Sequence, residues 1–539
     1  MHPITSPVAK LSLLVTPPDV AARDRQSLAD RVARLEAALA EVRDLSMSWA
    51  DTRDAGELFT QFEAKLKEKL QQVGRMASEV MLAEAELKSR MEHARRFLVG
   101  DTDFRLSGSE PRSLCTWFGV IRYRRSYARP LGGGPGFFPL DLGLGLLADR
   151  FSPSLVTTGA RLATRMSFAE AREVLGWFVP SPPSTEVLEH VVLGLGHHTF
   201  PWFENAPVPE DDGEVLIVHV DGKCVPTARE SELEKRRGPR KDKPPAPSPR
   251  HRGRAGRKAS GHRPRRKKGD KSKNGKLVTM VVMYTLRREG ALLLGPLNRR
   301  VYASFGPKRH AFEYARQEAK RRGFGPGTKR TIQLLTDGDP DLHRYVDEYF
   351  SADEYPERVV TVDIFHVLEK LWEAGRARHE EGSHALATWV KTQENRLYDD
   401  DAATIVTELR GWLEKTPKTG PGNKGKRKRI ADAIRYLDNR TDKLAYGSAR
   451  SRDLEVGTGQ VEGAIKHVIA KRCDHGGMRW IRQRAQAIIQ LRCIETNGQW
   501  TDFVAWTLRR LNSSARAAGC RARLQTRFPA ELPAVKEAA

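Results

Sequence analysis

The chain is poor in cysteine and has no long uncharged apolar run. Its five cysteines are an odd number without close pairs, which argues against a disulfide framework and fits a reducing cytoplasm. A membrane-spanning helix is not expected, because no window of about 18 uncharged apolar residues is present. The start of the sequence has only a short apolar patch and no basic leader, so it does not predict a signal peptide.

Motifs of several common chemistries are missing too. The sequence contains no phosphate-binding P-loop, no serine-triad pattern and no CxxC zinc pattern. Acidic residues are in the minority, with 68 Asp and Glu against 92 Lys and Arg, which gives a net charge of +24. This excess predicts a polyanionic partner: nucleic acid is the first candidate, and membrane phospholipid is the competing one.

The length of 539 residues is too great for one core, and a hydrophobic content of 39% is sufficient for several. We expect these regions in order: a disordered start at 1–20, helices at 21–100, a small β unit at 101–150, a helix-turn-helix-like region at 151–205, an α/β core at 206–375 with a disordered basic insertion at 229–276, a helical insertion at 376–455, the second part of the core at 456–500, and a C-terminal helix and tail at 501–539.

Three of these regions leave alternatives open. Leu28, Val32, Leu35, Leu39 and later apolar residues step by three and four, which is typical of a helical hairpin or of a dimerising coiled coil. Three short helices at 151–205 suit a helix-turn-helix whose third helix enters the major groove, or a small helical domain without DNA. The basic insertion lacks apolar residues, so it predicts a cationic arm on DNA phosphate, a linker or a localisation-like tract.

Three apolar strands run directly into an aspartate: VLIVHV into Asp221, TIQLLT into Asp337 and RVVTV into Asp363. A carboxylate at the carboxyl end of a buried strand lies at the rim where such sheets bind ligands. The predicted element order from residue 214 is β-β-β-α-β-α-β-α. This order is the ribonuclease-H-like pattern, a mixed sheet with flanking helices.

Asp221 and Asp337 are each followed by a glycine, so each could instead be a turn aspartate that bonds nearby backbone amides. Asp337 is preferred over Asp339 because it closes the strand, and Asp339 is better placed as the N-cap of the next helix. Glu462 lies among glycines on a helix whose apolar stripe would face the sheet. Its alternative is a solvated i,i+4 salt bridge with Lys466.

Asp221, Asp337 and Glu462 together are predicted to be catalytic and to hold two Mg²⁺ ions, with Mn²⁺ as a substitute, since hard cations prefer oxygen ligands. Two such ions would activate a water or a 3′-hydroxyl and stabilise the leaving oxygen at phosphorus. Asp363 and His366 are an accessory pair, or an N-cap aspartate beside a half-buried histidine.

Further residues are candidates for contact with DNA. Arg479 and Trp480 would contact the backbone and stack on a base near the cleavage site, although the tryptophan could equally belong to the core. Lys466 and Arg472, on the same helical segment as Glu462, complete this set.

Several motifs, together, resemble those of the ISKra-type insertion-sequence transposases, a bacterial DDE group with a ribonuclease-H-like core. They are GFFPLD followed by LGL, SFAEAREVL, VDGK, LLTDGDP, VDIFHVLEKLW and, the most specific, GTGQVEGAIKHVIAKRCDHGGMRWIRQRAQAIIQLR. The resemblance covers about Phe118 to Trp500. It places the family's two aspartates and glutamate on Asp221, Asp337 and Glu462, and its Asp-x-x-His element on Asp363 and His366.

The resemblance implies a transposase that binds the terminal inverted repeats of its own element, cuts DNA and joins the ends to target DNA. It implies a bacterial, cytoplasmic, nucleoid-associated protein that acts as a homo-oligomer, dimer or higher, on DNA and has no membrane partner. The family's β unit often carries a cysteine pair before GFFPLD, which this chain lacks. Two other functions are open: a non-catalytic or domesticated DNA-binding protein, and a structure-specific nuclease of the same fold.

Overall fold

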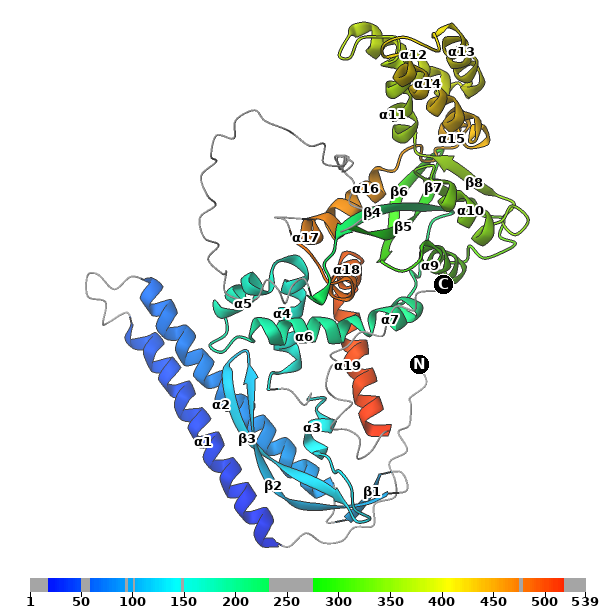
Figure 1. The fold of residues 1–539 in the computed structure, drawn as a ribbon. Helices are drawn as coiled ribbons and strands as arrows, with labels where there is room; N and C mark the ends of the chain where they lie inside the picture. Colours follow the sequence, from blue (N-terminus) through cyan, green and yellow to red (C-terminus); the bar gives the residue numbers. More distant parts are fainter. Residues whose placement is uncertain are drawn as a thin grey trace, which may run out of the picture. The chain divides into compact units, whose positions relative to one another are not determined.

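The computed structural model divides the chain into two compact units of mixed α and β structure (Figure 1). Unit 1 comprises residues 1–198 and 500–534, and unit 2 comprises residues 199–499 and 535–539. The structure describes residues 18–49, 59–92, 96–99, 102–146, 150–231, 275–474 and 478–517. Most of the predicted basic insertion, the predicted disordered start and the C-terminal tail therefore lie outside the described residues. No helix in the described ranges is long and apolar enough to cross a membrane.

Unit 1 begins with two long helices that pack against each other, α1 (Pro18–Ser48) and α2 (Phe59–Glu92). Two ion pairs link them: Arg31 lies 3.4 Å from Glu79, and the Lys69 ammonium lies 2.5 Å from Glu41. Leu28, Val32 and Leu35 of the predicted apolar seam are half-buried, whereas Leu39 is exposed. The chain thus forms the hairpin arrangement, and dimerisation through these helices stays a prediction.

A three-stranded antiparallel sheet follows, made of β1 (Arg96–Val99), β2 (Thr102–Thr116) and β3 (Gly119–Pro130). Helix α2 covers the open edge of β3 with two carboxylates. Glu79 accepts a hydrogen bond from the Arg122 amide at 2.9 Å, and Glu86 accepts one from the Ser126 amide at 2.7 Å. An edge strand with satisfied amides cannot recruit another strand there. The sheet starts inside the range that was expected to be helical.

The predicted trio of short helices is present as α4 (Pro153–Arg165), α5 (Phe168–Gly176) and α6 (Thr185–Gly196). Ser167 caps α5 in a reciprocal box with Glu170, and Ser184 caps α6, as the sequence predicts. Helix α6 is largely buried and carries glutamates but no lysine or arginine. Its chemistry is therefore unlike that of a helix that reads the major groove. Unit 1 also contains α3 (Pro139–Gly143) and α19 (Trp500–Ala517).

Unit 2 is built on a five-stranded sheet in the order β6-β5-β4-β7-β8. The strands are β4 (Val215–Pro226), β5 (Gly275–Glu289), β6 (Leu292–Ser304), β7 (Ile332–Thr336) and β8 (Arg358–Val362). The first three are antiparallel neighbours, and β7 and β8 run parallel to β4. Helices α9 (Lys308–Arg321), α10 (Pro340–Tyr349) and α11 (Ile364–Gly375) complete the predicted β-β-β-α-β-α-β-α order, which is confirmed.

One face of this sheet forms the main apolar core. Leu216, Val218 and Val220 of β4 point to this face and pack with residues of β7, α9 and α10. Because side chains alternate along a strand, His219 and Asp221 point to the opposite face. Helices α16 (Gly459–Ala464) and the π-helical segment η2 (Ile465–Ala470) lie against β4, and α18 (Arg482–Thr496) lies against β6.

The helical insertion has its own core. It contains α12 (His384–Tyr398), α13 (Ala402–Lys415), α14 (Asn423–Asp438), the short η1 (Thr441–Lys443) and α15 (Tyr446–Ser451). Buried residues of α13 and α14 pack with Val367 and Leu371 of α11, so the insertion is anchored to the helix that leaves β8. The remaining short helices of unit 2 are α7 (Thr199–Asn205) and α17 (Lys471–Cys473).

Candidate active site

Three aspartates stand side by side at one edge of the unit 2 sheet. Pairing among β4, β7 and β8 ends at Thr336 and its two partners, and the next residue on each strand is an aspartate. These residues are Asp221, Asp337 and Asp363. Since the three strands are parallel and in register, their carboxyl ends meet at the same edge, as the sequence predicts.

The details at Asp221 differ from the prediction. Strand β4 does not stop there but continues to Pro226, because β5 remains paired with it as far as Gly275. Gly222 lies inside this antiparallel ladder opposite Thr279, so it is not a turn that releases the chain. Only the pairing with β7 ends at Val220, and this leaves Asp221 at the rim.

The surroundings of Asp221 shift the pKa of its carboxyl group. Its pKa is raised to about 6 from an ordinary value of 3.8, chiefly by burial and to a smaller extent by the negative charges of Asp337 and Glu462. The Gly222 amide donates a 2.5 Å hydrogen bond to Asp221 Oδ1, and this bond lowers the pKa. His366 lowers it as well. The fold thus places Asp221 within electrostatic reach of both Asp337 and Glu462, although they are far apart in sequence.

The raised pKa of Asp221, which is due chiefly to burial, predicts a stability effect. The folded pKa of about 6 lies above the unfolded value, so folding loses stability as the pH rises from about 4 to about 6. Asp221→Asn should therefore raise the unfolding free energy of the metal-free protein at pH 8, by up to about 3 kcal/mol at about 1.4 kcal/mol per pKa unit. Urea unfolding in EDTA at pH 4 and pH 8 measures this. An equal effect at both pH values would refute it.

Asp337 lies at the start of a capped turn. Its Oδ1 accepts a 2.9 Å hydrogen bond from the Asp339 amide, and Asp339 in turn caps α10 by accepting from the Asp341 amide. The Lys308 ammonium lies 2.5 Å from Asp339. The predicted N-cap role of Asp339 is confirmed, and its carboxylate is engaged by a lysine, whereas Asp337 stays at the rim.

Glu462 is exposed on α16. The helix packs on β4 and β5 and continues into the π-helical turn η2, a distortion that occurs often at functional sites. Arg299 of β6 donates a 3.3 Å hydrogen bond to the Gln460 carbonyl in the first turn of α16. The helix that carries the third acid is thereby attached to the sheet.

Asp363 is fully buried and uses both carboxylate oxygens. Oδ1 accepts a 3.0 Å hydrogen bond from the Phe365 amide and caps α11, while Oδ2 accepts from the Thr458 hydroxyl. His366 is half-buried, with Nε2 at 3.9 Å from Asp363 Oδ2 and Nδ1 at 3.6 Å from Glu369. The N-cap interpretation is confirmed, and Asp363 also ties β8 to the segment that leads into α16.

Sequence reasoning missed a buried polar network beneath the acids. His219 Nε2 lies 3.0 Å from the Tyr284 hydroxyl, which donates to Glu455 at 3.1 Å. Gln333 of β7 exchanges hydrogen bonds of 2.6 and 3.0 Å with the backbone of Glu455. Burial, with the nearby Arg299, lowers the pKa of His219 to about 3, so this histidine is neutral. Polar residues inside otherwise apolar strands were the signal that could have revealed it.

The four candidates for DNA contact differ in exposure. Lys466 is exposed, and Arg479 and Trp480 are half-buried. Trp480 pairs through its backbone with Pro226 and Ala228, just beyond the end of β4. Arg472 is buried, with its guanidinium 4.6 Å from the Trp480 ring centroid. In this arrangement Arg472 orients the tryptophan, and Lys466 presents an exposed cation one helical turn after Glu462.

The carboxylate oxygens of Asp221, Asp337 and Glu462 are the kind of ligand that Mg²⁺ prefers. Across the described ranges, however, no group of three or more His, Cys, Asp and Glu side chains lies close enough together to hold a metal ion. Asp221 and Asp337 share one rim, and the helix of Glu462 packs on β4, but the three acids do not form a closed coordination shell.

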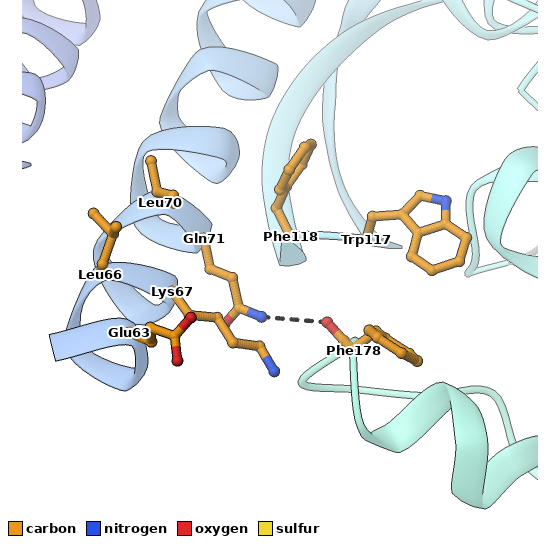
Figure 2. Close-up of a pocket in the computed structure, with 8 residues that line it drawn as sticks. All are labelled: Glu63, Leu66, Lys67, Leu70, Gln71, Trp117, Phe118 and Phe178. Carbon is orange, nitrogen blue, oxygen red and sulfur yellow. Dashed lines mark hydrogen bonds between the residues drawn. The ribbon is translucent and has the colours of Figure 1, made fainter. Parts of the chain in front are cut away.

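Unit 1 has an open pocket of about 380 Å³ between α2 and two loops (Figure 2). Lys67, Gln71 and Arg75, spaced one helical turn apart, donate hydrogen bonds to the carbonyls of Trp177, Phe178 and Phe118. The described lining is mainly apolar and aromatic, with Glu63 as its carboxylate. Its side chains offer a contact surface and lack the converging acids of the unit 2 rim.

Comparisons with known proteins add little. No protein-family model matches the chain, and no curated protein matches it. Among solved structures, the chain is similar to the Drosophila P element transposase strand transfer complex, with a TM-score of 0.29 and 9% sequence identity. That match covers 67% of this chain and 95% of the other. A likeness this weak does not bear on the function, which has to be argued from the site.

Proposed function

We propose that the chain is a DNA transposase of the DDE class that cuts and joins DNA with Asp221, Asp337 and Glu462. The observation that carries this proposal is the position of the acids. Asp221 and Asp337 directly follow the last paired residues of the adjacent parallel strands β4 and β7, and the helix that carries Glu462 packs on β4. The charges of Asp337 and Glu462 both contribute to the raised pKa of Asp221, which supports the same grouping.

The topology supports the same proposal. The mixed five-stranded sheet, with three antiparallel strands followed by two parallel ones and helices after β6, β7 and β8, supports the ribonuclease-H-like core that we propose. The resemblance of those motifs to ISKra-type transposases names the finer class. On this interpretation the helical insertion interrupts the fold between α11 and the glutamate helix.

The surroundings of each residue suggest its role in this proposal. Asp221, Asp337 and Glu462 would hold two divalent ions, Mg²⁺ or Mn²⁺, which supply activation of the attacking oxygen and stabilisation of the leaving oxygen. Asp363, with both oxygens engaged, holds the glutamate segment in place instead of acting as a ligand. Lys466, exposed one turn after Glu462, is suited to bind a DNA phosphate.

The partner we propose is DNA, both the ends of the element and the target. The net charge of +24 favours a polyanion, and the proposed chemistry requires phosphodiesters. Joining two ends to one target calls for a homo-oligomer, dimer or higher, on DNA.

A second candidate, a non-catalytic DNA-binding protein of the same fold, is favoured by one observation. The acids do not lie close enough to form a metal-binding group among the described residues. The deciding experiment is a cleavage assay with Mg²⁺ or Mn²⁺ on linear DNA that carries the gene's own flanking ends. Metal-dependent nicking at the ends supports the transposase. Binding without cleavage supports the second candidate, and cutting only of branched DNA would indicate a structure-specific nuclease.

A further inference from the structure

Tyr436 and Arg440 of the helical insertion bind the turn after Asp337, and these two residues are called the clasp below. Tyr436 of α14 donates a 3.1 Å hydrogen bond from its hydroxyl to the Asp337 carbonyl. Arg440, just beyond the end of α14, donates from Nε to the Gly338 carbonyl at 3.0 Å, and its Nη2 donates to the same oxygen. Two successive carbonyls at the proposed second acid are therefore held by one helix end, 99 and 102 residues away in sequence.

The clasp is itself rigid. Arg440 is buried, its Nη1 donates to the Tyr436 carbonyl at 2.8 Å, and its guanidinium lies 4.1 Å from the Tyr436 ring centroid. Helix α14 is fixed by buried residues that pack against α11 and α13. A charged group that is buried with several hydrogen bonds has little freedom, so the position of the turn follows that of α14.

Gly338 shows how closely the two parts fit. Its φ of +81° is a conformation that side chains rarely adopt. A β-carbon built there would lie 2.5 Å from the Tyr436 hydroxyl and 2.9 Å from Arg440 Nε. The glycine is thus needed for backbone contact with α14 as well as for the turn.

We propose that Tyr436 and Arg440 are positioning residues that orient the carboxylate of Asp337 and so set the metal affinity of the site. Holding the Asp337 and Gly338 carbonyls fixes the two peptide groups that follow the Asp337 α-carbon, and so the backbone from which the Asp337 side chain projects. The insertion then controls the site through direct hydrogen bonds, without contributing a ligand. This inference rests on the proposed function, because it takes Asp337 as a metal ligand.

The test is a Mn²⁺ titration of the full chain, in which free Mn²⁺ is followed by electron paramagnetic resonance. Tyr436→Phe removes the hydroxyl that donates to Asp337 and keeps the ring. Arg440→Lys keeps the positive charge and removes the guanidinium, which donates through two nitrogens to Gly338. Each should weaken Mn²⁺ binding about tenfold, with the same number of ions bound at saturation. Arg450→Lys is the matched control, since Arg450 also stacks on a tyrosine of the insertion, 4.6 Å from the Tyr398 ring centroid, but does not contact the turn.

A fourth variant, Asp337→Asn, separates this inference from the proposed function. If Asp337→Asn binds Mn²⁺ as the wild type does, the proposed ligand is wrong and both proposals fall. If it loses an ion while the Tyr436 and Arg440 variants bind normally, the positioning role alone is overturned. Thermal unfolding of every variant is recorded as well. A weakened affinity with an unchanged melting temperature supports positioning, and an affinity loss that only follows a lowered melting temperature refutes it.

Discussion

Asp221→Asn, Asp337→Asn and Glu462→Gln should each abolish metal-dependent DNA strand cleavage. Each change removes one anionic oxygen ligand while it keeps the size of the side chain. Metal catalysis contributes several kcal/mol of transition-state stabilisation, so the cleavage rate should fall by about a thousandfold or more, at about 1.4 kcal/mol per factor of ten. Binding to end DNA should persist, because the loss of a negative charge does not weaken contacts with phosphate.

The matched control is Asp341→Asn. Asp341 lies on the same turn as Asp337, but its carboxylate is exposed and 3.4 Å from the Lys308 ammonium. It should cleave nearly as the wild type does. Single-turnover cleavage and a gel-shift measurement on the same DNA check both expectations. Full cleavage by any one of the three amide variants would remove that residue from the site.

The rim could be predicted because it depends on local pattern. A buried run has two faces and a defined end, so an aspartate after the run marks a rim position even without knowledge of the neighbouring strand. Asp337 and Asp363 follow this rule directly. Asp221 does not, because the antiparallel partner β5 prolongs β4 to Pro226, and the length of a ladder depends on a strand far away in sequence.

The rest of the site could not be predicted because it consists of contacts between distant segments. The clasp of Asp337 by Tyr436 and Arg440 and the bond from Thr458 to Asp363 each join residues about a hundred positions apart. The role of Asp363, for example, could not be decided from the sequence. Strand position alone makes it equal to the other two aspartates, and only the capped helix and the Thr458 hydroxyl show that its oxygens are engaged.

The helix-turn-helix expectation shows a different limit. Helix lengths and caps at 151–205 agree with the structure, since they follow from local hydrogen bonding at Ser167 and Ser184. Which face of each helix remains exposed depends on packing within the trio. Helix α6 turns much of its surface inward, so helix spacing alone does not separate a helix-turn-helix from a small helical domain, and DNA binding by this region stays a prediction.

Asp212→Ala should lower the free energy of unfolding by about 3–5 kcal/mol, a severe loss for a single substitution. Asp212 precedes β4 and receives Arg322 in a two-point ion pair, with Nε at 2.6 Å and Nη2 at 2.7 Å. The Arg322 side chain is fully buried. Asn298 donates to the same carboxylate at 3.1 Å. The Thr285 hydroxyl is a further donor to it. Truncation would leave a buried guanidinium without its counter-charge.

The neighbouring Asp211 supplies a matched control, since it pairs with Arg287 at 2.6 Å but its side chain is 81% exposed. Asp211→Ala should cost less than about 1 kcal/mol, because water replaces a surface partner. Burial alone would raise the pKa of Asp212, but hydrogen bonds from Arg322, Thr285 and Asn298 together lower it. Its contribution is therefore present at neutral pH and is lost as the pH falls below the ordinary aspartate range of about 4. Denaturant unfolding of both variants at pH 7 should separate them widely. Similar losses for Asp211 and Asp212 would contradict the assignment of this stability to the buried pair.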